Sequence, residues 1–295
     1  MKKKIFTGSG VAIVTPFTED GINFPELGRL IDFNIANQTD AIVICGTTGE
    51  SATMTDEEHE EAIRFAVEHT NKRVPVVAGA GSNDTKYSAK LAQHAEAVGA
   101  DGLLLVTPYY NKTSQTGLVK HFTYVADRVD IPIIVYNVPS RTGIAITPAA
   151  YQEMSKHPNI VATKEAGGNI SDIAKTFDLC QGELDMYSGN DDQIFPILAY
   201  GGIGVISVLA NVMPKETHDI CQLFFDGKIA ESRALQLKLL NLTNSLFNEV
   251  NPIPVKTALS LMGYDVGPLR LPLVDMAPGN LEIMKRYMKE AGLIK

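Results

Sequence analysis

Lys164 lies two residues after the short apolar run 160–162 and is the first candidate for chemistry in this sequence. A lysine buried at the end of a parallel strand has its pKa lowered from about 10.4 toward neutrality, because burial disfavours the ammonium form. The free amine can then attack a carbonyl and form a Schiff base. Strand residues alternate between faces, so we place Lys164 on the same face as Ile160 and Ala162. Taken alone, a structural lysine paired with a carboxylate is the more ordinary interpretation.

Two other apolar runs are followed by groups that suit a small keto acid. Tyr136 ends one run, where its hydroxyl could relay protons, and Arg141 follows it with a planar fork that suits a substrate carboxylate. Thr47 and Thr48, on the turn after the other run, offer hydroxyls and backbone N–H groups to a small carboxylate. Each has an ordinary alternative: a core aromatic, a solvated loop charge, or a turn that only caps the next helix.

The histidines and cysteines do not form a metal-ligand pattern. The six histidines have no pair at ligand spacing, and we interpret them mostly as helix-surface residues, so no metal site is predicted. Cys45, Cys180 and Cys221 match neither a disulfide framework nor a zinc motif and indicate core thiols of a reducing cytosol. Whether Cys45, beside the threonine turn, is reactive stays open.

The elements that must position these groups recur along the first two thirds of the chain. Eight apolar runs, rich in Val and Ile and too short for helices, lie at 11–14, 41–45, 74–78, 102–106, 131–136, 160–162, 184–187 and 205–209. Segments of helical period alternate with them, such as 56–70, 85–99, 117–129 and 170–179, the first opening on a capping box at Thr55.

This alternation predicts an α/β fold, a (β/α)8 TIM barrel over residues 1–212, rather than a doubly wound open sheet. Residues 213–295 show only helical patterns, and we expect a C-terminal helical extension packed on the barrel. Active sites of such barrels lie at the carboxyl ends of the strands, which is where the candidate residues occur.

The composition excludes several classes of protein. The chain has 295 residues with a net charge of −8, and an acidic surface argues against a nucleic-acid partner. It contains no apolar stretch of about 18 residues, and the apolar run near the N-terminus is too short for a secretion signal. We therefore expect no membrane partner and a cytoplasmic location.

Seven segments, in this order, resemble the dihydrodipicolinate synthase family, the lysine-pathway branch of the class I, Schiff-base-forming pyruvate aldolases. They are GTTGES at 46–51, TPYYNK at 107–112, YNVPSRTG at 136–143, KEAGGN at 164–169, SGND at 188–191, GVISV at 204–208 and NPIPVK at 251–256. The resemblance extends from Gly8 to the C-terminus. It implies the condensation of pyruvate with L-aspartate-4-semialdehyde to 4-hydroxy-tetrahydrodipicolinate in lysine and diaminopimelate biosynthesis. It further implies a homotetramer, a dimer of dimers.

The resemblance also assigns roles to residues. Lys164 would carry pyruvate as an imine and then an enamine, without a cofactor, because the lysine itself supplies the electron sink. The proton relay would consist of Tyr136, Thr47 and Tyr110, with Tyr110 reaching in from a neighbouring subunit. The substrate-binding groups would be Thr48 and the backbone of Ile206 for the pyruvate carboxylate, Arg141 for the semialdehyde carboxylate, and Gly189 lining the site.

One departure from the family concerns a regulatory lysine site. Lysine-inhibited relatives have a histidine near the start of the second helix and a glutamate early in the third, and here those positions are Asp56 and Tyr87. The other positions match: Ser51, Ala52, His59, Asn83 and Tyr109. Loss of an imidazole and a carboxylate weakens recognition of the charged ends of lysine, so we predict weak or absent feedback inhibition.

Two alternatives remain open at this stage. Another aldolase of the superfamily, such as N-acetylneuraminate lyase or a keto-deoxy-sugar-acid aldolase, would share Lys164 and Tyr136 but usually has a serine at Thr47 and lacks Arg141. The pair Tyr109–Tyr110 and Arg141 favour the semialdehyde. A barrel that binds a keto acid without turnover is disfavoured, because binding alone does not require the tyrosine–threonine relay.

Overall fold

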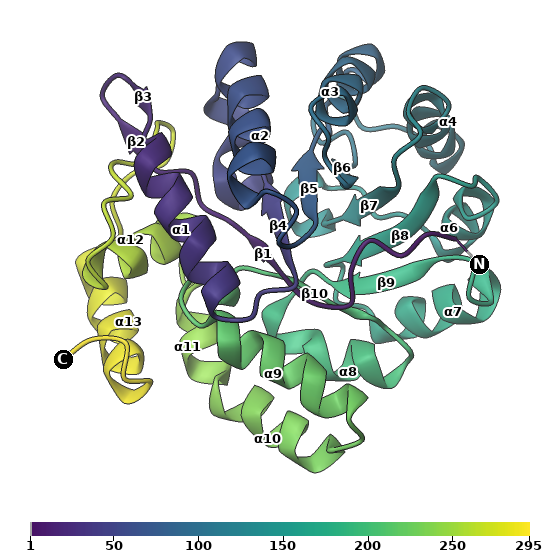
Figure 1. Cartoon of the computed structure of the whole chain (residues 1–295). Coiled ribbons are helices and arrows are strands. Elements are labelled where there is room, and N and C mark those ends of the chain that lie inside the picture. The colour runs from purple at the N-terminus through teal and green to yellow at the C-terminus, as the bar shows by residue number, and fades with distance from the viewer. Residues whose placement is uncertain (1) are drawn as a thin grey trace.

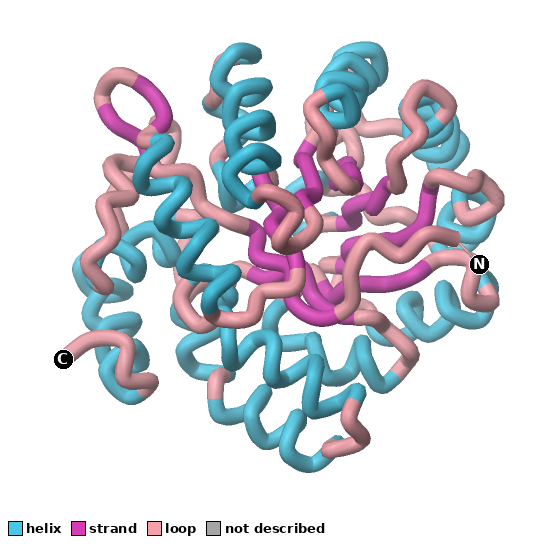
Figure 2. The backbone as a smooth tube through the Cα atoms, in the orientation of Figure 1, coloured by secondary structure: helices cyan, strands magenta, loops and turns pink. Residues whose placement is uncertain are grey.

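The computed structural model describes residues 2–295 and contains a closed barrel of parallel strands. In barrel order each strand pairs with the next in the chain, and β10 closes the ring against β1. The eight strands are β1 (Gly8–Ala12), β4 (Ala41–Ile44), β5 (Val76–Gly79), β6 (Gly102–Val106), β7 (Ile133–Asn137), β8 (Ile160–Glu165), β9 (Asp185–Ser188) and β10 (Gly204–Ser207). Figure 2 shows these strands at the centre of the molecule with helices around them. The predicted (β/α)8 barrel is confirmed.

The helices follow the strands in alternation (Figure 1). Those that follow the barrel strands are α2 (Asp56–Thr70), α3 (Thr85–Ala97), α4 (Gln115–Ala126), α5 (Pro139–Thr142), α6 (Pro148–Met154), α7 (Ile170–Cys180), α8 (Ile194–Ala199) and α9 (Pro214–Phe225), with α1 (Phe24–Ala36) after β1. A small antiparallel ribbon, β2 (Phe17–Thr18) and β3 (Gly21–Ile22), precedes α1. The predicted capping box of α2 is present, with the Thr55 hydroxyl accepting from the Glu58 N–H.

The chain ends in a group of helices beside the barrel. They are α10 (Ile229–Lys238), α11 (Leu240–Ser245), α12 (Ile253–Leu261) and α13 (Pro278–Glu290). In Figure 1, α12 and α13 lie at the edge of the molecule, beyond α1. Helix α9 packs against β1 and β10 and so covers the barrel directly, although it lies after residue 212. The predicted boundary between barrel and C-terminal extension at residue 212 stays a prediction. No helix within residues 2–295 is both long and apolar enough to cross a lipid bilayer.

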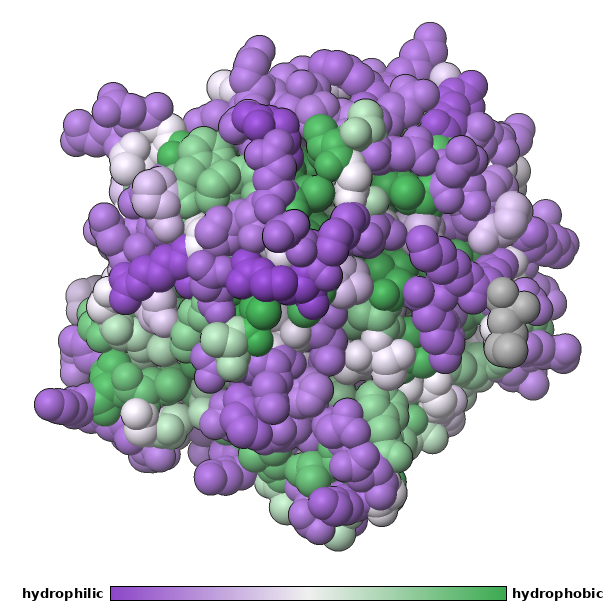
Figure 3. All heavy atoms as spheres, viewed as in Figure 1, coloured by the Kyte–Doolittle hydropathy of each residue, from purple (hydrophilic) through white to green (hydrophobic). Residues whose placement is uncertain are grey.

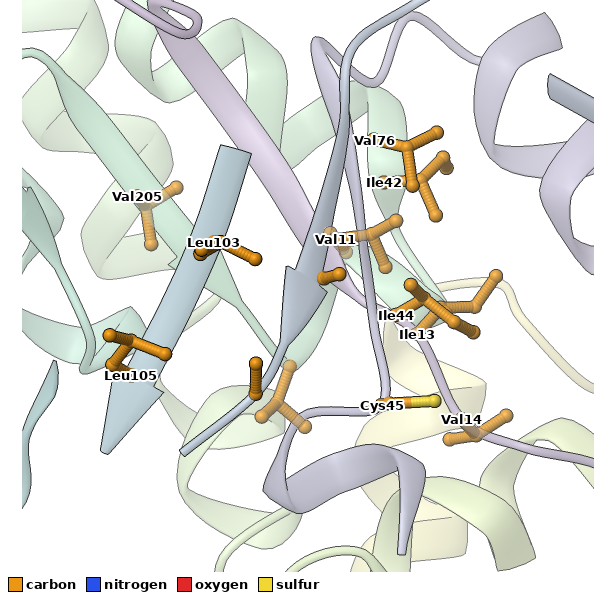
Figure 4. Close-up of a cluster of buried hydrophobic side chains, with 14 of the residues drawn as sticks. Val11, Ile13, Val14, Ile42, Ile44, Cys45, Val76, Leu103, Leu105 and Val205 are labelled. Atoms are coloured by element: carbon orange, nitrogen blue, oxygen red, sulfur yellow. The ribbon is translucent and has the colours of Figure 1, made fainter. Parts of the chain in front are cut away.

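The strands bury apolar side chains on both faces. On the outer face, Val11, Ile42 and Leu103 belong to the large cluster between strands and helices, part of which is drawn in Figure 4. On the inner face, Val43 and Leu104 belong to a second cluster that fills the barrel. The outward surface is mainly hydrophilic on the face shown in Figure 3, with small apolar patches.

A bulge in β8 changes which residues share a face with Lys164. Ile133 of β7 pairs with Ile160, whereas the next residue, Ile134, pairs with Ala162, so Val161 is an extra residue. Ile160 therefore packs in the outer cluster, and Ala162 lies in the inner one. The prediction that Lys164 shares a face with Ile160 is wrong, because the bulge reverses the alternation; the shared face with Ala162 is confirmed.

Candidate active site

Lys164 and Tyr136 are neighbours at the carboxyl ends of β8 and β7. The strand register pairs the two residues, and the Lys164 Nζ lies 4.3 Å from the centre of the Tyr136 ring. Both side chains are buried. Burial lowers the pKa of Lys164 to about 8; the carboxylate of Asp191 opposes this shift and the Arg141 guanidinium adds to it. Much more of the amine is therefore unprotonated near neutral pH than for an exposed lysine.

Gly189 leaves room for the stem of Lys164. Its N–H donates to the Glu165 carbonyl at 2.7 Å. A Cβ at this position would lie 3.1 Å from the Lys164 Cγ and 2.9 Å from the Ala166 Cβ. The structure thus places Gly189 against the lysine, and its role in lining the site stays a prediction.

The threonine turn forms a short helix, η1 (Thr47–Gly49), directly after β4. Thr47 faces a cavity, whereas Thr48 is buried and its hydroxyl accepts from Asn251 Nδ2 at 2.9 Å. Glu50 follows with a left-handed backbone (φ 56°), and it begins the next short helix, η2 (Ser51–Thr53). The two threonines therefore occupy a sharply defined turn at the barrel mouth.

A cavity of about 460 Å³ opens at this end of the barrel. Thr47, Tyr136 and Arg141 line it, together with Asn251. Its walls also include most of the predicted lysine-site residues, namely Ser51, Ala52, His59, Tyr87 and Tyr109. Two of the predicted catalytic residues, Thr47 and Tyr136, thus border one continuous space with these regulatory residues in a single chain. Lys164 is buried beside Tyr136 and does not itself line this space.

Asn251 lines the cavity, and sequence reasoning missed it. Besides its bond to Thr48, its carbonyl accepts from the Arg141 guanidinium at 3.0 Å. Its buried Oδ1 has no hydrogen-bond partner within residues 2–295. Asn251 begins the segment NPIPVK, which carried part of the family resemblance, but only the fold shows that this segment reaches the threonine turn.

Asp191 ends the segment SGND, and it begins the short helix η3 (Asp191–Gln193). Its buried carboxylate also accepts from the N–H groups of Val208 and Leu209, at 3.0 and 2.9 Å. These residues follow Ile206 on β10 and enter the short helix η4 (Leu209–Asn211). Burial raises the pKa of Asp191, whereas its hydrogen bonds and the Lys164 charge act in the opposite direction. Asp191 thus fixes the backbone beside the predicted carboxylate site.

Comparison with known proteins identifies the family. The sequence model of the dihydrodipicolinate synthetase family matches residues 5–291. A 4-hydroxy-tetrahydrodipicolinate synthase of Clostridium perfringens is 57% identical and covers 99% of this chain and 100% of its own. This chain belongs to the dihydrodipicolinate synthetase family. The predicted family is therefore confirmed.

Solved structures of family members agree with the fold. Dihydrodipicolinate synthase from Thermotoga maritima superposes with a TM-score of 0.96 at 41% identity, over 99% of this chain and 100% of its own. The enzyme from Cyanidioschyzon merolae, solved with lysine bound, gives a TM-score of 0.96 at 37% identity over 99% and 100% of the two chains. The likeness covers the barrel and the C-terminal helices alike.

Tyr110 is a predicted catalytic residue that a single chain leaves exposed to solvent. Its side chain is 88% exposed, and it does not line the cavity. The Asn83 Oδ1 accepts from the N–H groups of Tyr109 and Tyr110, at 2.8 and 3.1 Å, and so fixes this turn. In the part of the chain that is described, no hydrogen bond joins the hydroxyls of Thr47, Tyr136 and Tyr110. The role of Tyr110 stays a prediction that depends on a neighbouring subunit.

The two positions that depart from lysine-inhibited family members contact each other. The Tyr87 hydroxyl donates to Asp56 Oδ1 at 2.5 Å, and the Lys90 Nζ lies 3.4 Å from Asp56 Oδ2. His59 is buried, with its Nε2 2.8 Å from the Gly79 carbonyl. The Asp56 carboxylate is therefore already paired within the chain.

The interpretation of the histidines was partly wrong. His59 and His121 are buried rather than on the helix surface, because each lies on the inward side of its helix. Residues 2–295 contain no group of three His, Cys, Asp or Glu side chains arranged to hold a metal ion. Cys45, Cys180 and Cys221 are buried and unpaired. Burial raises the pKa of the Cys45 thiol, which disfavours the reactive thiolate.

Proposed function

We propose that this chain condenses pyruvate with L-aspartate-4-semialdehyde to give 4-hydroxy-tetrahydrodipicolinate, a step of lysine and diaminopimelate biosynthesis. Membership of the dihydrodipicolinate synthetase family supports the reaction. The observation that carries the chemistry is the buried Lys164, with a pKa of about 8 and its Nζ 4.3 Å from the ring centre of Tyr136. A lysine in this state is a nucleophile toward a keto group.

The first stage converts pyruvate into an enamine. The unprotonated Nζ of Lys164 adds to the C2 carbonyl of pyruvate, and loss of water gives a protonated imine. Removal of a proton from the methyl carbon then gives the enamine, whose positive charge is relieved by the electron pair of that C–H bond. Burial raises the pKa of Tyr136 to about 12, so its hydroxyl stays protonated and can donate a proton to the departing hydroxyl group, which leaves as water. Thr47 and a neighbouring Tyr110 would complete the relay, and no cofactor is required.

The second stage forms the carbon–carbon bond. The enamine carbon attacks the aldehyde carbon of the semialdehyde, whose oxygen takes up a proton and becomes the 4-hydroxyl, and the imine is restored. The amino group of the semialdehyde then replaces Lys164 at the imine carbon, which closes the ring and frees the lysine. The sum of the two substrates minus one water gives the product.

Both carboxylates need fixed partners during these steps. We propose that Thr48 and the backbone of Ile206 bind the pyruvate carboxylate. Gly189 would line the site beside them. Asn251 supports Thr48 by a hydrogen bond of 2.9 Å. We assign the semialdehyde carboxylate to Arg141, which is exposed at the cavity and can form a bidentate pair.

Borohydride reduction in the presence of pyruvate tests the mechanism. We expect a mass increase on the peptide that contains Lys164, and no increase in Lys164→Ala. An unchanged mass in the unsubstituted enzyme during turnover would refute the imine. A coupled assay with the semialdehyde, and in parallel with a sugar-like aldehyde, tests the second substrate: turnover of the sugar-like aldehyde alone would refute our assignment.

We also infer weak or absent inhibition by lysine. The Asp56 carboxylate is already bonded to Tyr87 and lies close to Lys90, whose ammonium repels the side-chain amine of a bound lysine. We further propose a homotetramer, supported by the exposure of Tyr110, and a cytoplasmic location, supported by three unpaired thiols.

A further inference from the structure

Asn137 and Glu165 directly follow Tyr136 and Lys164 in the chain. The register of β7 and β8 pairs Tyr136 with Lys164 and then Asn137 with Glu165. Successive residues of a strand point to opposite faces, so the second pair lies on the outer face of the barrel wall that carries the first. Neither Asn137 nor Glu165 has a role in the proposed reaction.

The Glu165 carboxylate collects hydrogen bonds from three separate segments. Asn137 Nδ2 lies 3.0 Å from both of its oxygens, and the Gly167 N–H donates at 2.6 Å. The Tyr151 hydroxyl of α6 donates at 2.9 Å and itself accepts from the Thr163 hydroxyl at 3.0 Å. Burial raises the pKa of Glu165, and the bonds from Asn137, Gly167 and Tyr151 oppose this rise because each of these groups can donate to the carboxylate.

The groups around Asn137 and Glu165 hold both side chains in one conformation. Asn137, Glu165 and Tyr151 are all buried. Asn137 Oδ1 accepts from the Ile146 N–H at 3.0 Å, which fixes the orientation of the amide and ties down the segment after α5. A Cβ at Gly167 would lie 2.6 Å from Glu165 Oε1, so a glycine is needed for the backbone to approach the carboxylate. Buried polar networks in which every member is satisfied are rigid.

We propose that Asn137 and Glu165 are positioning residues that set the separation of Tyr136 and Lys164 by locking together the ends of β7 and β8. The inference deepens the proposed function and rests on it. The bulge at Val161 makes such a lock necessary, because an extra residue weakens the ladder just before the paired ends. A displacement of about 1 Å in a catalytic pair lowers the rate about 100-fold.

Substitutions that exchange the amide of Asn137 and the carboxylate of Glu165 test this positioning role. In Asn137→Asp, two carboxylates face each other where an amide now donates, and we expect kcat to fall about 100-fold with little change in the KM for pyruvate. The rate of borohydride trapping should fall in parallel. The double variant N137D/E165Q restores one donor, one acceptor and one negative charge, so its kcat should recover at least about tenfold over N137D.

Two further variants separate positioning from a loss of stability. Tyr151→Phe removes one hydroxyl, which donates to Glu165 and accepts from Thr163, without touching the cavity, and we expect a smaller fall in kcat in a folded enzyme. Asn34→Ala removes a buried asparagine of α1, whose Nδ2 bonds the Leu30 carbonyl, and should lower the melting temperature while leaving kcat unchanged.

The outcomes are distinguishable. Folded N137D and Y151F with unaltered kcat, or a double variant no faster than N137D, would overturn the positioning role. Absence of pyruvate trapping in the unsubstituted enzyme would refute the proposed function instead. Recovery in N137D/E165Q together with an unaffected N34A supports the inference.

Discussion

The Lys256 Nζ lies 2.8 Å from Glu50 Oε1, and the two side chains are 2% and 0% exposed. Lys256 also donates to the Pro268 carbonyl at 2.8 Å, and the Arg270 N–H donates to the second Glu50 oxygen at 3.1 Å. Glu50 directly follows the threonine turn, whereas the other three residues belong to the C-terminal extension. The extension therefore holds the end of a turn that borders the cavity.

Replacing Lys256 by methionine should destabilise the fold strongly. The Glu50 carboxylate would remain buried without its ion-pair partner, so we expect the free energy of unfolding to fall by about 3–5 kcal/mol. Urea unfolding measures this. Lys285→Met is the matched control, because Lys285 pairs with the exposed Glu282 and should contribute at most about 1 kcal/mol. Equal effects of the two substitutions would contradict the structural role of the buried pair.

The sequence alone predicts the barrel and the site segments because strand ends and motifs are local signals. It does not predict the bulge at Val161, since Ile160, Val161 and Ala162 are all apolar and fit either face. Strand limits also shift: the first apolar run was 11–14, but β1 covers Gly8–Ala12, because its pairing with β10 starts at two glycines that carry no apolar signal.

Long-range partners account for the missed residues. Asn251 bonds to Thr48 across 203 positions, and Asp191 holds the backbone of Val208 and Leu209. Periodicity shows which face a side chain takes, but not which distant segment it meets there. The same limit applies to Tyr110, whose role depends on a second chain.

Lys164→Met should stabilise the protein in a pH-dependent way. The pKa of Lys164 is lowered from 10.5 to about 8 by folding, so below pH 8 the folded state bears the full penalty of a buried ammonium. The difference of about 2.5 between the two pKa values corresponds to about 3 kcal/mol. The free energy of unfolding of the methionine variant at pH 7 should therefore exceed that of the unsubstituted protein by this amount. The gain should shrink between pH 8 and 10.5, where the folded lysine is already neutral and the unfolded one is not. Chemical unfolding across this pH range measures the difference. A gain in the free energy of unfolding that does not depend on pH would show that the buried ammonium is not its cause.

The same shift predicts the pH dependence of imine formation. Only the unprotonated amine attacks pyruvate, so the rate of borohydride trapping should rise with pH and level off above a midpoint near 8. A midpoint near 10.5, the value of an unperturbed lysine, would show that Lys164 is not desolvated in solution.

Arg141→Ala should impair the reaction with the semialdehyde but still allow the reaction of Lys164 with pyruvate. We expect kcat/KM for the semialdehyde to fall about 10- to 100-fold, because a hydrogen-bonded charge partner is lost. Pyruvate trapping on Lys164 should keep its normal plateau rate when it is measured at a pH where the amine is unprotonated in both enzymes, since Arg141 contributes to the lowered pKa of Lys164. Arg141→Lys keeps the positive charge but loses the planar guanidinium. Its kcat/KM for the semialdehyde should therefore lie between the values of the unsubstituted enzyme and of Arg141→Ala. Loss of pyruvate trapping in Arg141→Ala would instead place the guanidinium in the first half of the reaction.

Wild-type turnover should persist in lysine concentrations that inhibit sensitive relatives. Restoring an imidazole and a carboxylate in Asp56→His with Tyr87→Glu also removes the contact between the two positions, and we expect lysine inhibition to appear. Initial rates with and without lysine measure it, with Lys90→Met as a control for the nearby charge. An inhibition constant of the unsubstituted enzyme in the low micromolar to sub-millimolar range would refute the prediction.

Tyr110 should act in the site of a neighbouring chain. Tyr110→Phe and Lys164→Ala are each expected to lose most activity when made alone. When the two variants are co-expressed, a mixed pair contains one site with both Lys164 and a Tyr110 from its partner, because a two-fold interface exchanges residues reciprocally. Random pairing then gives about a quarter of wild-type activity. If Tyr110 instead served its own chain, every site of a mixed pair would lack one group, and co-expression would restore nothing; separately purified variants, measured before any exchange of chains, provide the baseline.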